Sequence, residues 1–329
     1  MKASSGSANQ VVAISFDADT EERNLLESAF DKAAEVVFLP ELPQEERLAQ
    51  LQRADALLSW FPDRELRDTE EFAAIKDLRM MQLISAGADQ VSLSKLPSTL
   101  VVASNVGAYA EPMAEHALAM ILALEKNLLE RHNKLKVGRF DQNNMNRMLR
   151  GSKCAILGFG GIGKATARLL RCFDVKILAV NTTGSTSEPV EFVGTLKDLE
   201  RVLRAADIVL IALPLTSPTD GLLGERELGW MKEDATLVNV SRGAIIQEKA
   251  LFDHLNTHSR FSAAIDAWWH EPHTTGDFHT DYPFFELPNF LGSPHNSAIV
   301  PGSMQNALIC AAENVKRFLK GEPILGKVN

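Results

Sequence analysis

The sequence predicts an α/β protein made of two doubly wound parallel-sheet domains. Its 329 residues are enough for about two domains. Short apolar runs alternate with segments of helical periodicity, and this alternation is typical of parallel strands joined by helical crossovers. A polar, irregular stretch at residues 136–151 separates two such sets, so each set is expected to form its own sheet.

The first set contains five candidate strands, two helices and then a long helix. Strands are expected at residues 11–16, 35–39, 56–60, 80–84 and 100–103. Shorter helices are expected at residues 21–33 and 44–54. In the long helix, at residues 111–131, apolar side chains from Ala114 to Leu124 recur at spacings of three and four, which places them on one face.

The second set contains six candidate strands, at residues 154–157, 176–180, 208–213, 236–240, 262–267 and 290–292. Helical segments separate the first five, and an amphipathic helix is expected at residues 304–319. Residues 181–188 have the composition of a polar loop. Six strands in this rhythm are typical of a doubly wound nucleotide-binding domain.

The composition argues against several classes of protein, among them membrane proteins and disulfide-rich secreted proteins. The net charge of −9 argues against nonspecific binding to nucleic acid or to anionic membranes. The longest apolar helical candidate, at residues 114–124, is too short to span a bilayer, and residues 1–10 have no apolar core typical of a secretory signal. Three cysteines are too few for a disulfide scaffold, so a cytoplasmic location is expected.

A glycine-rich turn begins the second set. Gly158, Gly160 and Gly163 match the pattern G-x-G-x-x-G between an apolar run and a helical segment. In that context the first glycine makes a tight turn, the second lets the backbone approach a pyrophosphate, and the third lets the helix pack closely. The amides of Gly161 and Ile162, at the helix N-terminus, are expected to face the pyrophosphate. The turn therefore predicts a Rossmann dinucleotide site.

The residue expected to contact the ribose lies about 20 residues further on, at the end of the next strand. Asn181 and Thr182 stand there, and neither is the carboxylate that usually binds the 2′-hydroxyl of NAD. Neutral side chains at this position predict a site for NAD or NADP, with a weak preference for NADP.

Polar residues follow three late strands of the second set. Arg242 follows the strand at residues 236–240, and Asp266 and Glu271 lie at the end of the next strand and just after it. His295 comes shortly after the last strand. Because open α/β sheets bind ligands at the carboxyl ends of their strands, these residues are candidates for a catalytic site.

These features resemble the D-isomer-specific 2-hydroxyacid dehydrogenase family over essentially the whole chain. The similarity lies in the mid-chain glycine motif, the stretch from Ala212 to Thr216, and the order Arg242, Glu271, His295 with separations of 29 and 24 residues. The resemblance implies a flavodoxin-like substrate domain at residues 1–112 and 301–329. It also implies a Rossmann domain at residues 113–300, a cleft between the two domains, and a homodimer formed through the Rossmann domain.

The resemblance also implies the catalytic roles. His295 would exchange a proton with the hydroxyl or carbonyl oxygen of a small 2-hydroxyacid or 2-oxoacid, because imidazole gains and loses its proton near neutral pH. Glu271 would fix the tautomer of His295, and Arg242 would hold the substrate carboxylate with its planar fork. Hydride transfer to or from NAD(P) would complete an oxidoreductase reaction.

Further binding roles follow from the same resemblance. Pro214 and Asp266 would contact the cofactor, with Asp266 at the nicotinamide carboxamide. The amides of Ala86 and Gly87, after a strand of the first domain, would hold the substrate carboxylate. An ordinary strand–helix turn remains the alternative for that loop.

Several residues depart from the family pattern or keep two interpretations. Tyr109 stands where many members have asparagine, and the pair Trp268-Trp269 is unusually bulky, so a separate substrate pocket or core packing are both open. Trp60 and Phe61 are expected either to line the substrate site or to pack in a core or interface. No metal site is expected, because His270 and His273 lack a carboxylate or cysteine partner at ligand spacing.

Two other functions stay open at this point. One is a dinucleotide-sensing regulatory protein without catalytic activity on the same scaffold, since such proteins can keep the same residues. The other is a phosphite-type dehydrogenase. A formate dehydrogenase is disfavoured, because those members carry glutamine in place of Glu271.

Overall fold

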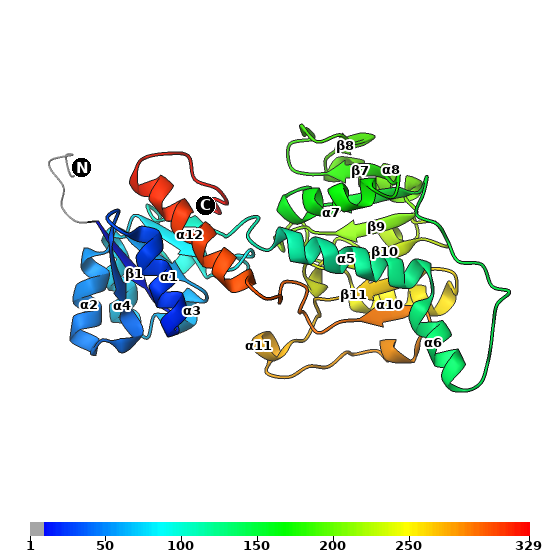
Figure 1. Ribbon diagram of the computed structural model, residues 1–329, viewed down its shortest axis with the longest axis horizontal. Helices are drawn as coiled ribbons and strands as arrows, with labels where there is room; N and C mark the ends of the chain where they lie inside the picture. Colours follow the sequence, from blue (N-terminus) through cyan, green and yellow to red (C-terminus); the bar gives the residue numbers. More distant parts are fainter. Residues whose placement is uncertain (1–9) are drawn as a thin grey trace. The chain divides into compact units, whose positions relative to one another are not determined.

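The computed structural model describes residues 10–329 and divides the chain into two compact units (Figure 1). The first unit comprises residues 1–109 and 301–329, of which residues 1–9 lie outside the described part, and the second comprises residues 110–300. Helix α5 (Ala110–Glu125) begins the second unit, so its first three residues, assigned to the substrate domain from the sequence, belong to the second unit.

The first unit is built around a parallel sheet. Within the described residues its strands take the order β2-β1-β3-β4-β5, the 2-1-3-4-5 order of flavodoxin-like folds. The strands are β1 (Val11–Ile14), β2 (Glu35–Phe38), β3 (Ala56–Ser59), β4 (Met80–Leu83) and β5 (Val101–Ala103). Its helices are α1 (Thr20–Phe30), α2 (Gln44–Arg53), α3 (Pro62–Glu65), α4 (Thr69–Ala74) and α12 (Ser303–Leu319).

Helices cover both faces of this sheet, and this explains its strand composition. The last helix, α12, packs beside α1 and against β4, although the chain of the second unit separates it from both (Figure 1). Helices α2 and α4 pack on the opposite face around a core that contains Leu51 and Leu57. Strands covered on both sides are mostly apolar, and β1 and β3 are buried throughout.

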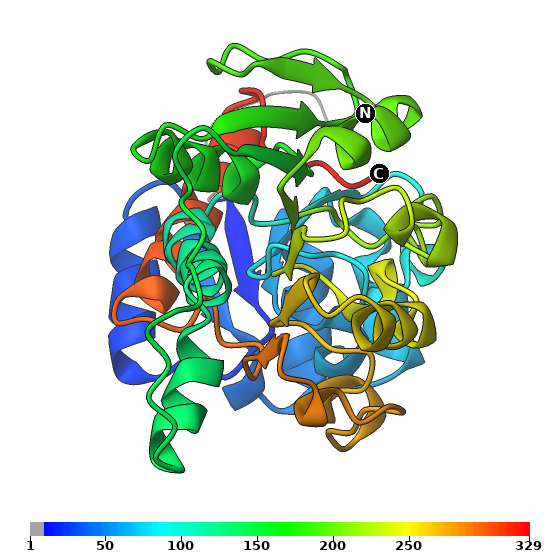
Figure 2. The ribbon, with the colours of Figure 1, turned by 90° about the vertical axis from the view of Figure 1, so that its right-hand side faces the viewer.

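The second unit contains a larger parallel sheet. Its described strands take the order β12-β11-β10-β9-β6-β7-β8, which is the 3-2-1-4-5-6 order of Rossmann domains with one strand added (Figure 2). The strands are β6 (Lys153–Leu157), β7 (Lys176–Val180), β8 (Phe192–Gly194), β9 (Ile208–Ile211), β10 (Thr236–Asn239), β11 (Ser262–Ile265) and β12 (Phe290–Gly292). The α/β class with two doubly wound parallel sheets is therefore confirmed.

Helices again cover both faces of the sheet. Helix α5 packs against α7 (Gly161–Arg171) and against β10 and β11 on one face. The opposite face holds α8 (Leu199–Ala205), α9 (Glu225–Leu228) and α10 (Glu248–Thr257), whose apolar side chains join one core with β6 and β9. The short helix α11 (Pro272–Thr275) lies in the segment between β11 and β12. The order reverses between β6 and β9, so their carboxyl ends form the point where dinucleotides bind such sheets.

Two expectations about single elements were wrong. The helix expected at residues 111–131 is broken, because Asn127 takes a left-handed conformation (φ 50°) and α6 (Leu128–Lys136) starts in a new direction. At the end of the first helix, the buried carboxylate of Glu125 accepts a hydrogen bond from the hydroxyl of Thr236 (2.7 Å). Strand β8, three residues that pair only with β7, was not expected either.

None of the helices in the described part of the chain is both long enough and apolar enough to cross a membrane.

Candidate active site

The glycine turn after β6 leads directly into α7, with Gly160 as its N-terminal cap. Gly158 has a φ of +98°, and a Cβ built there would lie 2.3 Å from the carbonyl oxygen of Ala212. At Gly163 a Cβ would lie 2.3 Å from the carbonyl oxygen of Gly158, so strand and helix meet backbone to backbone. The space around Gly160 is open instead, which leaves room for a pyrophosphate at the amides of Gly161 and Ile162.

The loop after β7 is organised by Asn181. Its side-chain oxygen accepts hydrogen bonds from the amides of Thr183 (3.0 Å) and Gly184 (2.7 Å), and its amide donates to the carbonyl of Ser185 (2.8 Å). Thr182 lies exposed at the start of this loop. Asn181 therefore shapes the expected ribose loop with the same polar atoms that were expected to contact the ribose.

Pro214 lies exposed in the loop after β9. Its carbonyl accepts a hydrogen bond from the hydroxyl of Thr219 (2.6 Å), which closes the following turn. The hydroxyl of Ser241 donates to the carbonyl of Leu213 and so ties this loop to the one after β10. The loop that carries Pro214 is thus joined to the loop that carries Arg242.

Arg242 follows β10 in a turn that Asn239 holds. The side chain of Asn239 donates to the carbonyl of Arg242 (2.8 Å) and accepts from the amide of Ser241 (3.0 Å). The next residue, Gly243, lies against the peptide that joins Trp268 to Trp269, and a Cβ there would be 2.3 Å from the carbonyl carbon of Trp268. This backbone contact brings the loop of Arg242 beside the segment that leads to Glu271.

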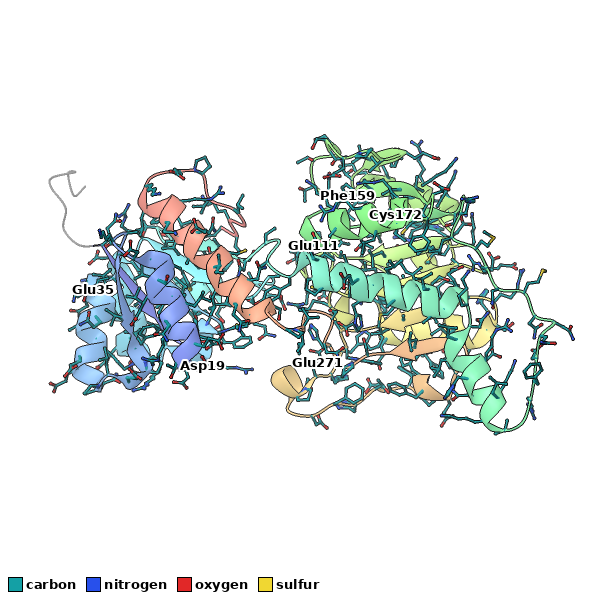
Figure 3. The ribbon with its side chains drawn as sticks, in the orientation of Figure 1. Asp19, Glu35, Glu111, Phe159, Cys172 and Glu271 are labelled. Atoms are coloured by element: carbon teal, nitrogen blue, oxygen red, sulfur yellow. The ribbon has the colours of Figure 1, made fainter. Side chains whose placement is uncertain are left out.

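His295 and Glu271 form the central pair of the site. The Nδ1 atom of His295 lies 2.8 Å from Oε2 and 2.9 Å from Oε1 of Glu271. An ionised carboxylate only accepts hydrogen bonds, so Nδ1 carries the proton in this pair and Nε2 is the ring nitrogen on the side away from Glu271. Glu271 is buried beside α11 (Figure 3) and also accepts from the amide of Trp268 (2.7 Å).

Asp266 fixes the loop that carries His295. Its side chain is fully buried and accepts hydrogen bonds from the hydroxyl of Ser293 and from the amides of Asn296 (3.2 Å) and Ser297 (3.3 Å). Its carbonyl accepts from the amide of His295 (2.9 Å), whose φ is +49°. These bonds stabilise a left-handed histidine that local preference disfavours. The expected contact of Asp266 with the nicotinamide stays a prediction.

His116 and Ser293 belong to the same network and were missed as site residues. The Nε2 atom of His116, on α5, lies 3.0 Å from the hydroxyl of Ser293 and 3.7 Å from a carboxylate oxygen of Asp266. In the sequence His116 only interrupts an apolar helix face. No local pattern predicts its contact with Ser293, which lies 177 positions away. Ser293 itself could have been identified, because it lies two residues before His295.

Ala86 and Gly87 lie in the first unit, in the loop after β4. The hydroxyl of Ser85 donates to the carbonyl of Gly87 (2.7 Å) and holds the loop in a turn. Among residues 10–329, no protein group accepts a hydrogen bond from the amides of Ala86 or Gly87. Two adjacent unsatisfied amides at the carboxyl end of a parallel strand form a suitable cradle for a carboxylate.

Trp60 and Phe61 follow β3, the neighbour of β4, and their rings stack with centroids 6.2 Å apart. Both are half-buried, and both backbone amides donate to the carboxylate of Glu65. They therefore lie at the same edge of the sheet as the loop of Gly87.

The residues that depart from the family pattern have structural partners. Tyr109 is buried, and its hydroxyl donates to the carbonyl of Ile84 (3.1 Å). Trp268 is 6% exposed and donates from its indole to the carbonyl of Ser293 (2.8 Å). Trp269 donates to the carbonyl of Ile246 (2.6 Å) and stacks on Phe284. The core interpretation of the tryptophan pair is the one these contacts support.

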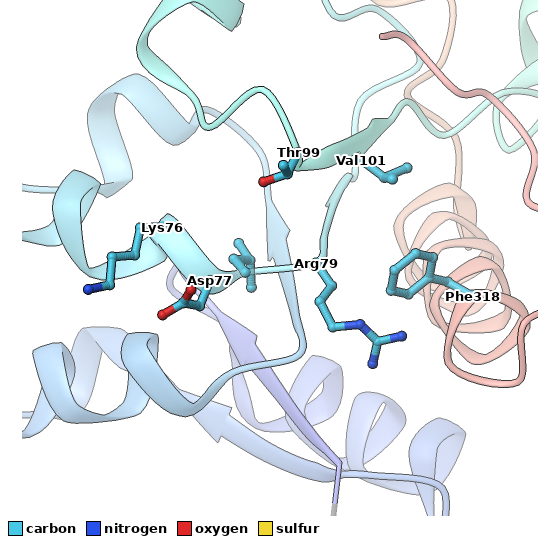
Figure 4. Close-up of a pocket in the computed structure, with 7 residues that line it drawn as sticks. Lys76, Asp77, Arg79, Thr99, Val101 and Phe318 are labelled. Atoms are coloured by element: carbon cyan, nitrogen blue, oxygen red, sulfur yellow. The ribbon is translucent and has the colours of Figure 1, made fainter. Parts of the chain in front are cut away.

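A hollow of about 370 Å³ lies elsewhere on the first unit (Figure 4). Arg79 and Thr99, which line it, precede β4 and β5, and Arg79 lies 5.2 Å from the ring centroid of Phe318. The hollow is therefore at the amino ends of the strands. Ligands bind such sheets at the opposite edge, so this hollow is not the candidate site.

A glycine cradle at the switch point of a Rossmann sheet, with a histidine–carboxylate pair and an arginine on neighbouring loops, defines a dinucleotide-dependent oxidoreductase site. The comparisons with known proteins agree. Residues 118–297 match the model of the D-isomer specific 2-hydroxyacid dehydrogenase family, NAD binding domain. The chain belongs to this family.

The named relatives of this chain include glyoxylate reductases and D-3-phosphoglycerate dehydrogenases. The chain is 28% identical over 291 residues to the glyoxylate reductase of Thermococcus gammatolerans, covering 86% of this chain and 85% of that protein. It is 26% identical over 264 residues to the D-3-phosphoglycerate dehydrogenase of Archaeoglobus fulgidus, covering 80% of this chain but only 49% of that protein. The chain thus spans about half the length of that relative.

Among solved structures, a glycerate dehydrogenase related protein from Thermoplasma acidophilum shares the fold. Its identity to this chain is 30%, and the TM-score is 0.64. The match covers 94% of this chain and 99% of that protein.

Proposed function

We propose that the protein is an NAD(P)-dependent oxidoreductase that interconverts a small 2-oxoacid and the corresponding D-2-hydroxyacid. The observation that carries the proposal is the pair formed by His295 and Glu271, with Arg242 on a neighbouring loop. Family membership supports the reaction class. In the reductive direction, a 2-oxoacid, NAD(P)H and a proton give the hydroxyacid and NAD(P)⁺.

The cofactor fits the residues that the cradle provides. Bound NAD(P)H supplies the hydride that reduces the carbonyl carbon of the substrate. The amides of Gly161 and Ile162 would hold the pyrophosphate, since a Cβ is excluded at Gly158 and Gly163 while the space at Gly160 is open. Pro214 and the loop of Asn181 and Thr182 are proposed to contact the rest of the nucleotide.

His295 is proposed to be the acid of the reduction and the base of the oxidation. Nδ1 donates to Glu271, so Nε2 gives a proton to the oxygen that becomes the hydroxyl. The charge of Glu271 stabilises the imidazolium form that precedes this transfer. Arg242, in the second unit, is proposed to bind the substrate carboxylate. For the first unit, the amides of Ala86 and Gly87 are proposed as donors to a carboxylate.

The nature of the ribose loop supports use of both cofactors with a preference for NADP. The residue at the end of β7 is Asn181, and its side chain is already bonded to its own loop. It therefore places no carboxylate where a 2′-phosphate would be repelled. Comparison of kcat/KM for NADH and NADPH measures this preference.

We also propose a homodimer formed through α6 and the segment that follows it. Apolar side chains are strongly exposed there, among them Leu135 (54%), Val137 (70%), Phe140 (75%) and Met145 (91%). In Figure 1 this segment extends from the body of the second unit. Contiguous exposed apolar side chains typically mark an interaction surface. Light scattering at the mass of one 36.2 kDa chain would contradict the proposal.

The proposed location is the cytoplasm, which the free thiols of all three cysteines support.

The test of the proposed function is a substrate screen with a matched variant. Glyoxylate, hydroxypyruvate, pyruvate and bulkier 2-oxoacids are each offered with NADH and with NADPH. The His295→Ala variant should lose about 10²–10⁴-fold in kcat while its affinity for the cofactor is unchanged. Tight binding of NADH without turnover of any 2-oxoacid would contradict the proposal and favour a dinucleotide-sensing protein.

A further inference from the structure

A second group of ligand-type side chains lies outside the catalytic pair. One ligand atom each of His270, His279 and Asp281 lies within 4.8 Å of the other two. His270 is half-buried, and the other two are exposed. No local pattern predicts this group, because eight residues separate the two histidines. His273, considered with His270 as a metal ligand from the sequence, has a side chain that lies outside the described residues.

The backbone holds these side chains together. His270 and His279 form an antiparallel bridge, so they stand directly opposite each other on neighbouring chain segments. Their rings are almost parallel, with centroids 4.1 Å apart and an angle of 11°. Asp281 follows two residues after His279, and its carboxylate lies 3.8 Å from Nε2 of His270. The juxtaposition therefore depends on the chain path as well as on side-chain rotamers.

Aromatic contacts hold residues 278–282 against the rest of the second unit. The ring of Phe278 packs edge-on against Trp268 with centroids 5.1 Å apart. Tyr282, next to Asp281, stacks on Phe252 of α10 at 5.3 Å. Because Phe278 precedes His279 and Tyr282 follows Asp281, both sides of the ligand-bearing stretch are tied to the core.

Two more carboxylates surround the group. An oxygen of Asp277 lies 3.3 Å from Nδ1 of His279, so this imidazole can donate from Nδ1 and present Nε2. Histidines that bind metals commonly donate their second ring nitrogen to a carboxylate in this way. Glu248 accepts the amide of Asp281 (2.9 Å) and interacts electrostatically with both imidazoles. The surroundings are therefore negative, which favours a cation over an anion.

We propose that His270, His279 and Asp281 form a binding site for a divalent transition metal ion of the zinc class. Two imidazole nitrogens and one carboxylate oxygen are a ligand set that Zn²⁺ accepts, with water in the remaining position. Mg²⁺ and Ca²⁺ prefer oxygen ligands, so two histidines disfavour them. The site is separate from the hydride-transfer chemistry.

The site has a structural consequence because Glu271 follows His270 directly in the chain. An ion bound to His270 and His279 closes the loop of residues 270–279 and restrains its first residue, next to the catalytic carboxylate. A ligand that binds only the folded chain raises its stability. Metal binding is therefore expected to raise the Tm of the full chain.

The experiment titrates the chelator-treated full chain with Zn²⁺ by calorimetry and with Co²⁺ by visible absorption. The expected result is one ion per chain, a Co²⁺ spectrum with nitrogen ligands, and a higher Tm with Zn²⁺. The His279→Gln and Asp281→Asn variants should each weaken binding at least about tenfold. Circular dichroism checks that each variant is folded. If His279→Gln does not fold, Asp281→Asn is the variant that tests the site.

A matched control exists within the same unit. His254 and His258 also stack with centroids 4.1 Å apart, but within the described residues they belong to no group of three ligand side chains. The His258→Gln variant should therefore bind Zn²⁺ like the unmodified chain. The proposal is overturned if the unmodified chain binds no Zn²⁺ at about 1 mM, or if folded His279→Gln and Asp281→Asn bind it as tightly as His258→Gln does.

Discussion

The carboxylate of Glu271 holds Nδ1 of His295 at 2.8 Å, while the same carboxylate accepts the backbone amide of Trp268 at 2.7 Å. One buried side chain thus connects the loop after β11 with the loop after β12. The orientation of the histidine ring depends on a carboxylate that is itself held by backbone. This relation gives the first prediction.

Replacement of Glu271 by Gln should lower kcat at least about 10²-fold with little change in cofactor affinity. The amide keeps the size of the side chain but removes the charge that stabilises the imidazolium, and its NH₂ group can select the wrong tautomer. Steady-state kinetics and a fluorescence titration with NADH measure the two quantities. A kcat close to that of the unmodified protein would show that His295 does not depend on this carboxylate.

Replacement of Gly243 by Ala should destabilise the protein by about 1–3 kcal/mol. A Cβ there would lie 2.3 Å from the carbonyl carbon of Trp268, so two backbone segments must move apart. Because Arg242 precedes this glycine, KM for the 2-oxoacid should rise as well. Denaturant unfolding and kinetics check both effects.

The matched control is Gly229→Ala, where the nearest atom to a new Cβ is the carbonyl oxygen of Glu225 at 3.2 Å. Its loss of stability should be clearly smaller. Equal losses for the two variants would contradict the close approach at Gly243.

Replacement of Asn181 by Asp should shift the cofactor preference toward NADH. A carboxylate at the end of β7 can accept from the ribose hydroxyls of NADH and repels the 2′-phosphate of NADPH. The ratio of kcat/KM for NADPH to that for NADH should fall at least about tenfold. An unchanged ratio would mean that the loop of Asn181 does not face the ribose.

The fourth prediction concerns stability at acid pH and arises from His254 on α10. Burial, together with a smaller effect of the nearby His258, lowers the pKa of His254 to about 4. Between pH 6.5 and pH 4 the unfolded chain therefore binds more protons at this residue than the folded chain does. The free energy of unfolding should fall as the pH drops through that window.

The His254→Phe variant should flatten this part of the pH dependence, since it removes the titrating group and keeps a ring against Phe261. Urea unfolding at pH 7, 6, 5 and 4 measures the difference. Parallel curves for the unmodified protein and for His254→Phe would contradict the assignment.

Much of the fold followed from local pattern. The buried strands β1 and β9 are continuous apolar runs because helices cover both faces of each sheet, and such runs stand out in the sequence. The three-residue strand β8 was not recognised, and the break of the long helix comes from a left-handed Asn127, a conformation that the apolar period does not reveal.

The sequence by itself predicted the α/β class and a glycine turn that opens a helix, because strand period and the glycine pattern are local properties. The candidate set Arg242, Glu271 and His295 followed from strand ends together with the resemblance to the family. The contact of Glu271 with His295, which the family resemblance implies, is present in the structure. Only the tertiary structure decided that Asp266 holds the histidine loop through Ser293 and that His270 meets His279. These relations join residues on separate chain segments, and no local preference encodes the distance between such segments.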